Sequence, residues 1–211
     1  MSEGLREIKM RASRRAMEQV AVDIAYEEGV AAVTVDRVCA GAQVSRSTFF
    51  NYFPNLDHAI FGSPLEFDPT VTEPILEAHA DDLVMASTLI VIAHVRGDKD
   101  DALARRRLAL FAREPGTTNA VSWASDESRK RLVAVLEQWR ERHPAATRLP
   151  ADDPATEARI AVGLSVALGD EAMRSAREVD GELQLDVAVF EAVRSRMAAV
   201  AAMTATPAQT P

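Results

Sequence analysis

Apolar residues recur at three- and four-residue steps along most of the chain, which is the spacing of one face of an α-helix. In the first helical stretch, residues 6–28, this face carries Met17, Val20, Ala21 and Ile24. Strict alternation of the β type does not stand out in any segment, and neither does an internal repeat. The pattern predicts an all-α protein, with helices over residues 6–28, 35–41, 46–52, 55–61, 80–95, 98–113, 117–142, 155–177 and 182–203.

Caps and chain breakers set the ends of the short N-terminal helices. Gly29 suits a C-cap after the first helix. Thr34 and Ser45 precede the second and third helices, where a side-chain hydroxyl accepts a hydrogen bond from a free backbone N–H. Pro54 ends the third helix and opens the fourth, because its ring cannot continue a helix but fits a first turn.

Prolines gather in residues 62–74, as Pro64, Pro69 and Pro74, and indicate a junction between two domains. We predict an N-terminal domain of residues 1–62 and a second helical domain of residues 63–204. Residues 205–211 are low in complexity, so we expect a disordered tail there.

Composition bounds the class of protein. The 211 residues, 47% of them hydrophobic and 27% charged, suffice for a soluble protein with a substantial core. Cys39 is the single cysteine, which excludes an internal disulfide and a zinc site built on paired cysteines. No apolar run reaches the roughly 18 residues of a membrane span, and residues 1–15 lack a signal-peptide core. We therefore expect a cytoplasmic protein with no membrane partner.

The net charge of −8 argues at first against a nucleic-acid partner. Charge is unevenly distributed, however, since residues 1–15 hold five basic residues against Glu3 and Glu7. The basic residues are Arg6, Lys9, Arg11, Arg14 and Arg15. This stretch is either a locally basic arm that contacts DNA or a solvated helix start, and charge alone favours neither.

Residues 14–60 carry the chemistry. Two short helices flank a tight turn, and apolar residues stand where a small three-helix core needs them, at Val35, Val38, Cys39, Val44, Phe49 and Phe53. Residues 46–52 leave an outer face that is polar and narrow enough for the major groove. Arg46 on that face can read guanine with two hydrogen bonds, and Tyr52 has the reach to hold a phosphate.

At these residues the chain resembles the tetracycline-repressor (TetR) family of bacterial regulators. The resemblance runs through Arg14, Met17, Val20-Ala21, Ile24, Gly29, Thr34-Val35, Val38-Cys39, Ala42, Val44-Ser45, Ser47-Thr48-Phe49-Phe50 and Tyr52-Phe53-Pro54. It implies an all-helical homodimer that binds double-stranded operator DNA through an N-terminal helix-turn-helix. It also implies a C-terminal domain whose ligand usually relieves repression. The DNA-binding residues we expect are Lys9, Arg11, Thr34, Ser45, Arg46, Ser47, Thr48, Asn51, Tyr52 and His58.

Three positions depart from the family pattern. Gln43 stands in the turn where glycine is usual, and a positive φ there would strain it by roughly 1 kcal/mol. Leu56 replaces a usual lysine, so a phosphate contact is lost that His58 restores only in part. Phe50 replaces a common tyrosine and removes a hydroxyl. We expect weaker binding to the DNA backbone than in a typical relative.

The C-terminal stretch predicts dimerisation and a ligand pocket with less detail. Apolar stripes at Ala158, Ala161, Leu164, Leu168 and Ala172, and at Leu183, Val187, Phe190, Val193, Met197 and Val200, suit a four-helix bundle of two subunits. The alternative is that both stripes pack within their own subunit. A lipophilic effector, with acyl-CoA as the candidate class, is expected among Leu89, His94, Leu108, Phe111, Trp123, Leu164 and Met173. The run 105–107, three arginines, either attracts an anionic head group or is a solvated helix face.

An enzyme is not expected. Inward-facing Glu-x-x-His pairs for a di-iron site are absent, and no nucleophile elbow, phosphate loop or dinucleotide motif occurs. We therefore expect no catalytic residue, metal or cofactor. One alternative remains for the function: a helical adaptor or ligand-binding protein of the same fold that has lost DNA binding, which Gln43 and Leu56 favour.

Overall fold

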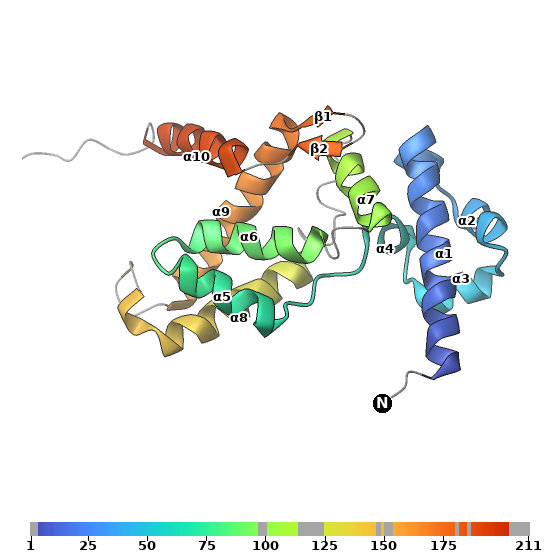
Figure 1. The fold of residues 1–211 in the computed structure, drawn as a ribbon, viewed down its shortest axis with the longest axis horizontal. Coiled ribbons are helices and arrows are strands. Elements are labelled where there is room, and N and C mark those ends of the chain that lie inside the picture. Colours follow the sequence, from blue (N-terminus) through green and yellow to red (C-terminus); the bar gives the residue numbers. More distant parts are fainter. Residues whose placement is uncertain are drawn as a thin grey trace, which may run out of the picture. The chain divides into compact units, whose positions relative to one another are not determined.

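A computed structural model of the protein describes residues 4–96, 101–113, 125–146, 149, 154–179, 182–184 and 187–202. The described residues form helices joined by short connections, apart from one small hairpin (Figure 1). The predicted all-α fold is confirmed. The helices are α1 (Leu5–Glu28), α2 (Val35–Ala42), α3 (Arg46–Tyr52), α4 (Leu56–Phe61), α5 (Pro69–Ala78), α6 (Leu83–Arg96), α7 (Ala102–Arg113), α8 (Asp126–Arg142), α9 (Pro154–Ser175) and α10 (Val187–Ala202), with single 3-10 turns at Val30–Ala32 and Pro144–Ala146.

The N-terminal helices begin where their caps predict. The Thr34 hydroxyl accepts from the Arg37 amide at 3.3 Å, and the Ser45 hydroxyl accepts from the Thr48 amide at 3.1 Å. These bonds satisfy backbone N–H groups that have no partner within the helix. Gly29 ends α1 with a φ of 89°, a conformation that glycine adopts without a steric penalty.

The junction predicted at residues 62–74 contains a helix. Asp68 caps α5 by accepting from the Thr70 amide at 2.8 Å, and Pro69 occupies the first turn, where its missing N–H is not needed. Pro74 lies inside α5, and the helix continues to Ala78. The three prolines were interpreted as chain breakers, although Pro69 begins a helix and Pro74 lies within it. The domain junction itself stays a prediction.

The end of the chain also differs from the prediction. The expected helix over residues 182–203 is wrong at its start, because Glu182–Gln184 forms strand β2 and α10 begins only at Val187. Strand β1 (Arg177–Val179) pairs antiparallel with β2, with Arg177 opposite Gln184. An Asp180-Gly181 pair stands between the strands in the sequence and is the missed signal, since two-residue hairpin turns favour it.

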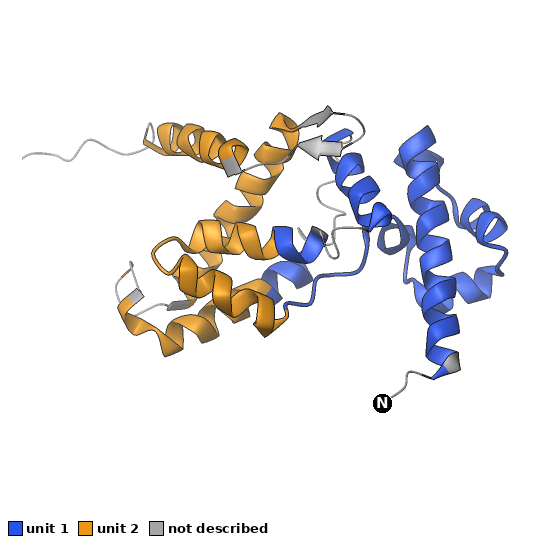
Figure 2. Cartoon of the chain, viewed as in Figure 1, with its two compact units in different colours: residues 1–67, 92–131 blue, residues 68–91, 132–211 orange. Residues whose placement is uncertain are grey.

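The chain divides into two compact units, which are coloured separately in Figure 2. Unit 1 comprises residues 1–67 and 92–131, and unit 2 comprises residues 68–91 and 132–211. The predicted boundary between a DNA-binding domain (residues 1–62) and a ligand-binding domain (residues 63–204) stays a prediction.

In unit 1, helix α1 packs against α2, α4 and α7. The core between the N-terminal helices is closed by side chains without solvent exposure, including Met17, Val38 and Phe49. Phe53 adds a second ring to Phe49, with the ring centroids 5.3 Å apart. This packing supplies the rigid base from which α3 projects.

Arginines of α7 tie that helix to α1 and α4. Arg107 donates to the carbonyls of Ile60 at 2.8 Å and Ala59 at 3.0 Å, at the end of α4. Arg106 pairs with Asp23 of α1, and Asp101 accepts two hydrogen bonds from Arg15. Burial lowers the pKa of Arg107. Two members of the 105–107 run therefore have structural partners within unit 1.

In unit 2, α9 packs against α10. Ala158, Ala161, Leu168 and Ala172 are buried in the single chain, as are Phe190 and Val193 of α10. These six residues thus pack within their own subunit, whereas Leu164 and Val200 of the same two stripes are exposed. Leu183 lies in β2 and not on the helix. A buried ion pair, Arg140 with Glu157 at 3.0 Å, joins α8 to α9.

Candidate nucleic-acid interface

Helix α2 approaches α1 closely at one glycine. A Cβ added at Gly41 would lie 2.6 Å from Cγ1 of Val20, closer than carbon atoms approach in proteins. Gly41 therefore sets the distance between α1 and α2. The turn itself is shaped two residues later, by Gln43.

Gln43 ends α2 in the left-handed conformation, with φ 55° and ψ 44°. The strain anticipated at this position is therefore present, and a residue with a Cβ is disfavoured there by about 1–2 kcal/mol. The turn is nevertheless formed, since the Val44 amide donates to the Cys39 carbonyl at 3.0 Å. Cys39 is buried, and burial raises the pKa of its thiol, which keeps it protonated and unreactive.

Helix α3 follows this turn with one buried and one open side. Phe49 is buried, whereas Arg46, Ser47 and Asn51 are exposed. Thr48 and Tyr52 are half-buried. Around the N-cap, the Ser45 hydroxyl lies 2.8 Å from the hydroxyls of both Ser47 and Thr48. The structure thus gathers the predicted residues of α3 at one exposed surface.

Two further residues belong to this surface, although sequence reasoning did not place them among the DNA contacts. Phe50 is 51% exposed, although its edge meets the ring of Phe49 with centroids 5.3 Å apart. Asp36 of α2 accepts from Arg46 at 2.6 Å, with both side chains well exposed. The helical spacing of Phe50 from Arg46, four residues, was the available signal for the first. No sequence signal paired Asp36 with Arg46, because they lie on different helices.

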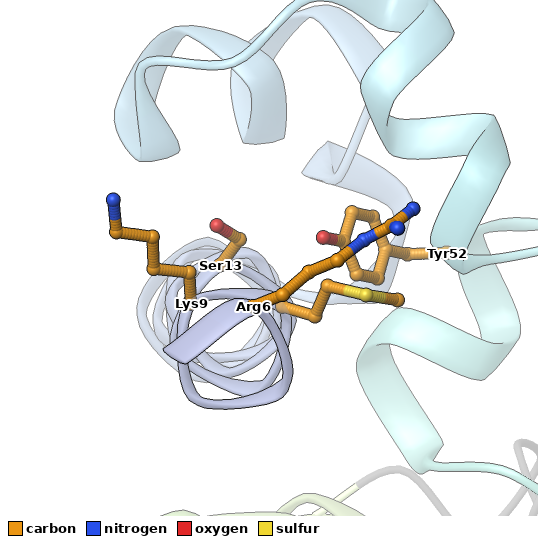
Figure 3. Close-up of a pocket in the computed structure, with 5 residues that line it drawn as sticks. Arg6, Lys9, Ser13 and Tyr52 are labelled. Carbon is orange, nitrogen blue, oxygen red and sulfur yellow. The ribbon is translucent and has the colours of Figure 1, made fainter. Parts of the chain in front are cut away.

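A second basic surface faces α3 from α1. Arg6, Lys9, Met10 and Ser13 line a shallow cavity of about 460 Å³ together with Tyr52 (Figure 3). Lys9 and Tyr52 were predicted as DNA contacts, whereas Arg6 was named only as part of the basic stretch and Ser13 was missed. Their spacing of three, four and seven residues places the α1 members on one helical face, a signal that the sequence contained.

The remaining predicted DNA contacts lie apart from this cavity. Arg11 is exposed, and its position two residues after Lys9 puts it on a different side of α1. Thr34 is exposed at the start of α2. His58 is half-buried in α4, where its Nδ1 lies 2.8 Å from Oδ1 of Asn55. Leu56, in the first turn of α4, offers no donor.

The predicted effector residues are divided between the two units, and the effector site stays a prediction. Leu89, Leu164 and Met173 belong to unit 2, and His94, Leu108 and Phe111 belong to unit 1. Phe111 is buried and stacks on Phe61 of α4 at 5.7 Å, while the His94 ring meets the edge of Phe67. Leu164 is 43% exposed on α9. Trp123 lies outside the described residues.

Helices α2 and α3 are joined by a tight turn and pack on α1, and α3 exposes a polar face. This arrangement defines a helix-turn-helix protein. Residues 19–57 match the family model for bacterial regulatory proteins of the tetR family. This match confirms the resemblance found in the sequence, over the N-terminal segment that the family model covers. The matched residues cover α2 and α3 with the turn between them.

Other comparisons add little to this assignment. A solved structure, Salmonella enterica GusR, is similar to the chain with a TM-score of 0.44 and 15% sequence identity, over 90% of this chain and 95% of that chain. No curated protein sequence matches the chain. Among the described residues, no helix is long and apolar enough to cross a membrane, and no three His, Cys, Asp or Glu side chains are grouped to hold a metal.

Proposed function

We propose that the protein is a dimeric transcriptional repressor that inserts α3 into the major groove of operator DNA and releases it when a small molecule binds. The observation that carries the proposal is the exposed polar surface of α3 on a rigid apolar base. Arg46 is suited to read guanine, and Ser47 and Asn51 to bond base edges. Thr34, Ser45, Thr48, Arg11 and His58 are suited to phosphates.

A dimer is needed because one recognition helix contacts too few bases for useful specificity. Helix α9 supports a dimer through a face that its own subunit leaves uncovered. Ile160 is 50% exposed and Leu164 43% exposed. Gly163 and Ala167 lie on the same side, and nothing lies within 4 Å of a Cβ built on Gly163. The small residues permit a second copy of α9 to approach closely.

An effector can act on the DNA-binding helices through α7. Leu108 and Phe111, two of the predicted effector residues, share this helix with Arg107, which bonds the end of α4. A ligand that contacts this side of α7 and moves the helix would therefore also move α4 and α1, to which α7 is attached. The ligand shifts the population of DNA-competent dimers only by its difference in affinity for the two shapes.

A buried group in unit 2 supports a ligand with a polar atom. The indole N–H of Trp139 is buried without an acceptor among the described residues, and its ring stacks on His143 at 4.4 Å. An unbonded buried donor costs about 1–3 kcal/mol, which a carbonyl of a lipophilic effector would offset. Thermal shift with an acyl-CoA panel tests this class, and stabilisation at saturation is expected. Absence of any shift would exclude acyl-CoA as the effector.

Binding to DNA is tested by fluorescence anisotropy with the protein's own upstream duplex over a range of salt concentrations. A repressor shows a steep linear fall of log affinity with log salt. Arg46→Ala and Tyr52→Ala should weaken binding without lowering the melting temperature. The exposed Lys130→Ala on α8 is the matched control for loss of a positive charge. A protein that binds no duplex at low salt would instead be the helical adaptor.

A further inference from the structure

Helix α2 places a carboxylate beside the residue that is suited to read guanine. Oδ1 of Asp36, in the first turn of α2, accepts a hydrogen bond at 2.6 Å from Nη1 of Arg46, the first residue of α3. Both side chains are well exposed, Arg46 by 60% and Asp36 by 72%. Because the pair lies in water, either member is able to exchange its partner for another. Arg46 is therefore held by an anion of its own chain, through a contact that DNA can replace.

The next residue of α2 forms a much firmer arginine pair. Arg37 donates through Nη1 to Oε2 of Glu28 and to the Ala32 carbonyl, each at 3.0 Å, and through Nη2 to Oε1 of Glu28. Three hydrogen bonds thus tie α2 to the end of α1. Arg46 makes one side-chain hydrogen bond among the described residues, and its Nε and Nη2 donors stay open. The pair of Arg46 with Asp36 is therefore the easier one to break.

The relative strength of the competing contacts decides when Arg46 leaves Asp36. An exposed ion pair changes an equilibrium constant by no more than about fivefold. Two hydrogen bonds to a guanine favour that base over the others by about fivefold to more than a hundredfold. A guanine at the matching operator position therefore displaces Asp36. A phosphate at an unmatched position offers only another exposed contact, of the kind that the arginine already has.

We propose that Asp36 is a specificity-determining residue, which shields Arg46 from the phosphates of unmatched DNA and releases it to guanine in the operator. The inference rests on the proposed function, and it assigns a role to a residue that lowers affinity for every duplex. On unmatched DNA the charge of Arg46 stays neutralised, so that each protomer makes one phosphate contact fewer. Shielding raises selectivity, which matters because a genome offers about a million or more competing sites.

A residue that shields Arg46 and a carboxylate that only repels DNA predict different responses to salt. Without Asp36, Arg46 is free to contact a phosphate of any unmatched duplex. That contact adds about 0.9 per protomer to the slope of log affinity against log salt. On the operator, Arg46 contacts guanine with or without Asp36, so the slope changes less. Loss of the Asp36 carboxylate should thus strengthen binding to unrelated duplex more than binding to the operator.

The test compares Asp36→Asn with Asp57→Asn, which removes the same charge from the same part of another helix. Both aspartates are exposed in the first turn of their helices, α2 and α4, and no described arginine pairs with Asp57. Anisotropy is measured on the upstream duplex and on an unrelated duplex, from about 50 to about 200 mM salt. We expect Asp36→Asn to lose operator preference by roughly threefold per protomer at the lowest salt, and by less as salt rises. Asp57→Asn should leave the preference unchanged.

A double-variant cycle shows whether this effect depends on Arg46. In the Arg46→Ala background, Asp36→Asn should strengthen binding to unrelated duplex no more than Asp57→Asn does. Melting temperatures of all variants are compared first, because both aspartates lie at helix starts, where a negative charge is stabilising.

Three results would overturn the shielding role: equal gains on both duplexes in Asp36→Asn, a gain that persists without Arg46, or weaker binding of Asp36→Asn to the operator. The last would show that Asp36 positions Arg46 for guanine. The proposed function stands in each of these cases, provided that the wild type prefers its operator and Arg46→Ala loses that preference. A wild-type protein that binds no duplex would remove both proposals together.

Discussion

Helices α3 and α9 both leave one face of the single chain open, and the two faces differ in chemistry. Helix α3 exposes Arg46, Ser47 and Asn51, whereas α9 exposes Ile160 and Leu164. Hydrogen-bond donors that point into water suit a hydrated, anionic surface such as a DNA groove. Apolar side chains in water favour burial against another protein surface. The chain therefore leaves open two faces of different chemistry, and we propose that one meets DNA and the other a second subunit.

The largest effect is expected at the apolar face. Leu164→Asp places a charge in the proposed dimer contact and should weaken self-association by about 2 kcal/mol or more, which is roughly thirtyfold. Sedimentation velocity at micromolar concentration measures the shift from dimer to monomer, and operator affinity should fall with it. Val71→Asp, which changes an apolar residue 36% exposed on α5, is the matched control. A dimer that survives Leu164→Asp would remove α9 from the interface.

A substitution on the polar face of α3 should change the preference of the protein for its operator over other duplexes. Arg46→Ala removes a guanidinium suited to guanine and should cost about 1–3 kcal/mol on the operator. Little change is expected on unrelated duplex, so the ratio of the two affinities reports the loss. Lys130→Ala should leave this ratio unchanged. Equal losses on both duplexes would make Arg46 a backbone contact and not a reader of bases.

The next largest effect is expected from substitution of Gln43, the strained residue in the turn before α3. Gln43→Gly removes the steric penalty of a left-handed residue, offset in part by the greater freedom of glycine in the unfolded chain. The free energy of unfolding should rise by about 0.5–1 kcal/mol in urea denaturation. Gln43→Ala retains a Cβ and should give no such gain. A gain in both variants would show that the left-handed conformation is not the source of the effect.

Removing the ion pair on the DNA-facing surface should have a smaller effect, of opposite sign. Asp36 holds Arg46 at 2.6 Å and adds a negative charge to this surface. Asp36→Asn should strengthen DNA binding by about 0.2–1 kcal/mol, the usual range for an exposed pair. The change is measured by anisotropy at low salt, where screening is weakest. Weaker binding would mean that Asp36 positions Arg46 and does not compete with DNA for it.

The smallest effect concerns acid stability. The hydrogen bond from Arg15 is the main cause that lowers the pKa of Asp101, with amides of Leu103 and Ala104 contributing. Because the folded pKa lies below the unfolded one, the pair stabilises the fold above the unfolded value, near 3.9. That contribution disappears as pH falls through the folded pKa. The Asp101→Asn variant should therefore have a lower melting temperature than the wild type at pH 7. The difference between the two melting temperatures should become smaller as the pH is lowered toward 3.

Local features of the fold were predictable from the sequence, and contacts between distant residues were not. Thr34 and Ser45 were identified as caps because a cap depends on neighbours three residues away. The strain at Gln43 followed from the turn alone. By contrast, Asp36 with Arg46 depends on how two helices pack. Arg107, interpreted as part of a solvated or ligand-attracting run, bonds carbonyls of α4 that lie 47 and 48 residues earlier.

The exposed face of α3 could be predicted more completely than an effector pocket for the same reason. Contacts of α3 lie within one short segment whose exposed positions follow from helical spacing. An effector pocket is lined by several helices, so its members depend on tertiary packing. Leu164 illustrates the difficulty: its apolar character fitted both a pocket and a dimer contact, and its exposure on α9 favours the second.

The central claim, that α3 enters a groove of duplex DNA, is tested most directly by amide chemical shifts of the labelled protein with and without its upstream duplex. The account predicts that the largest shifts occur in residues 45–52, with a second group in residues 6–13 and little change along α5. Large shifts confined to other helices, with residues 45–52 unaffected at saturating DNA, would contradict it.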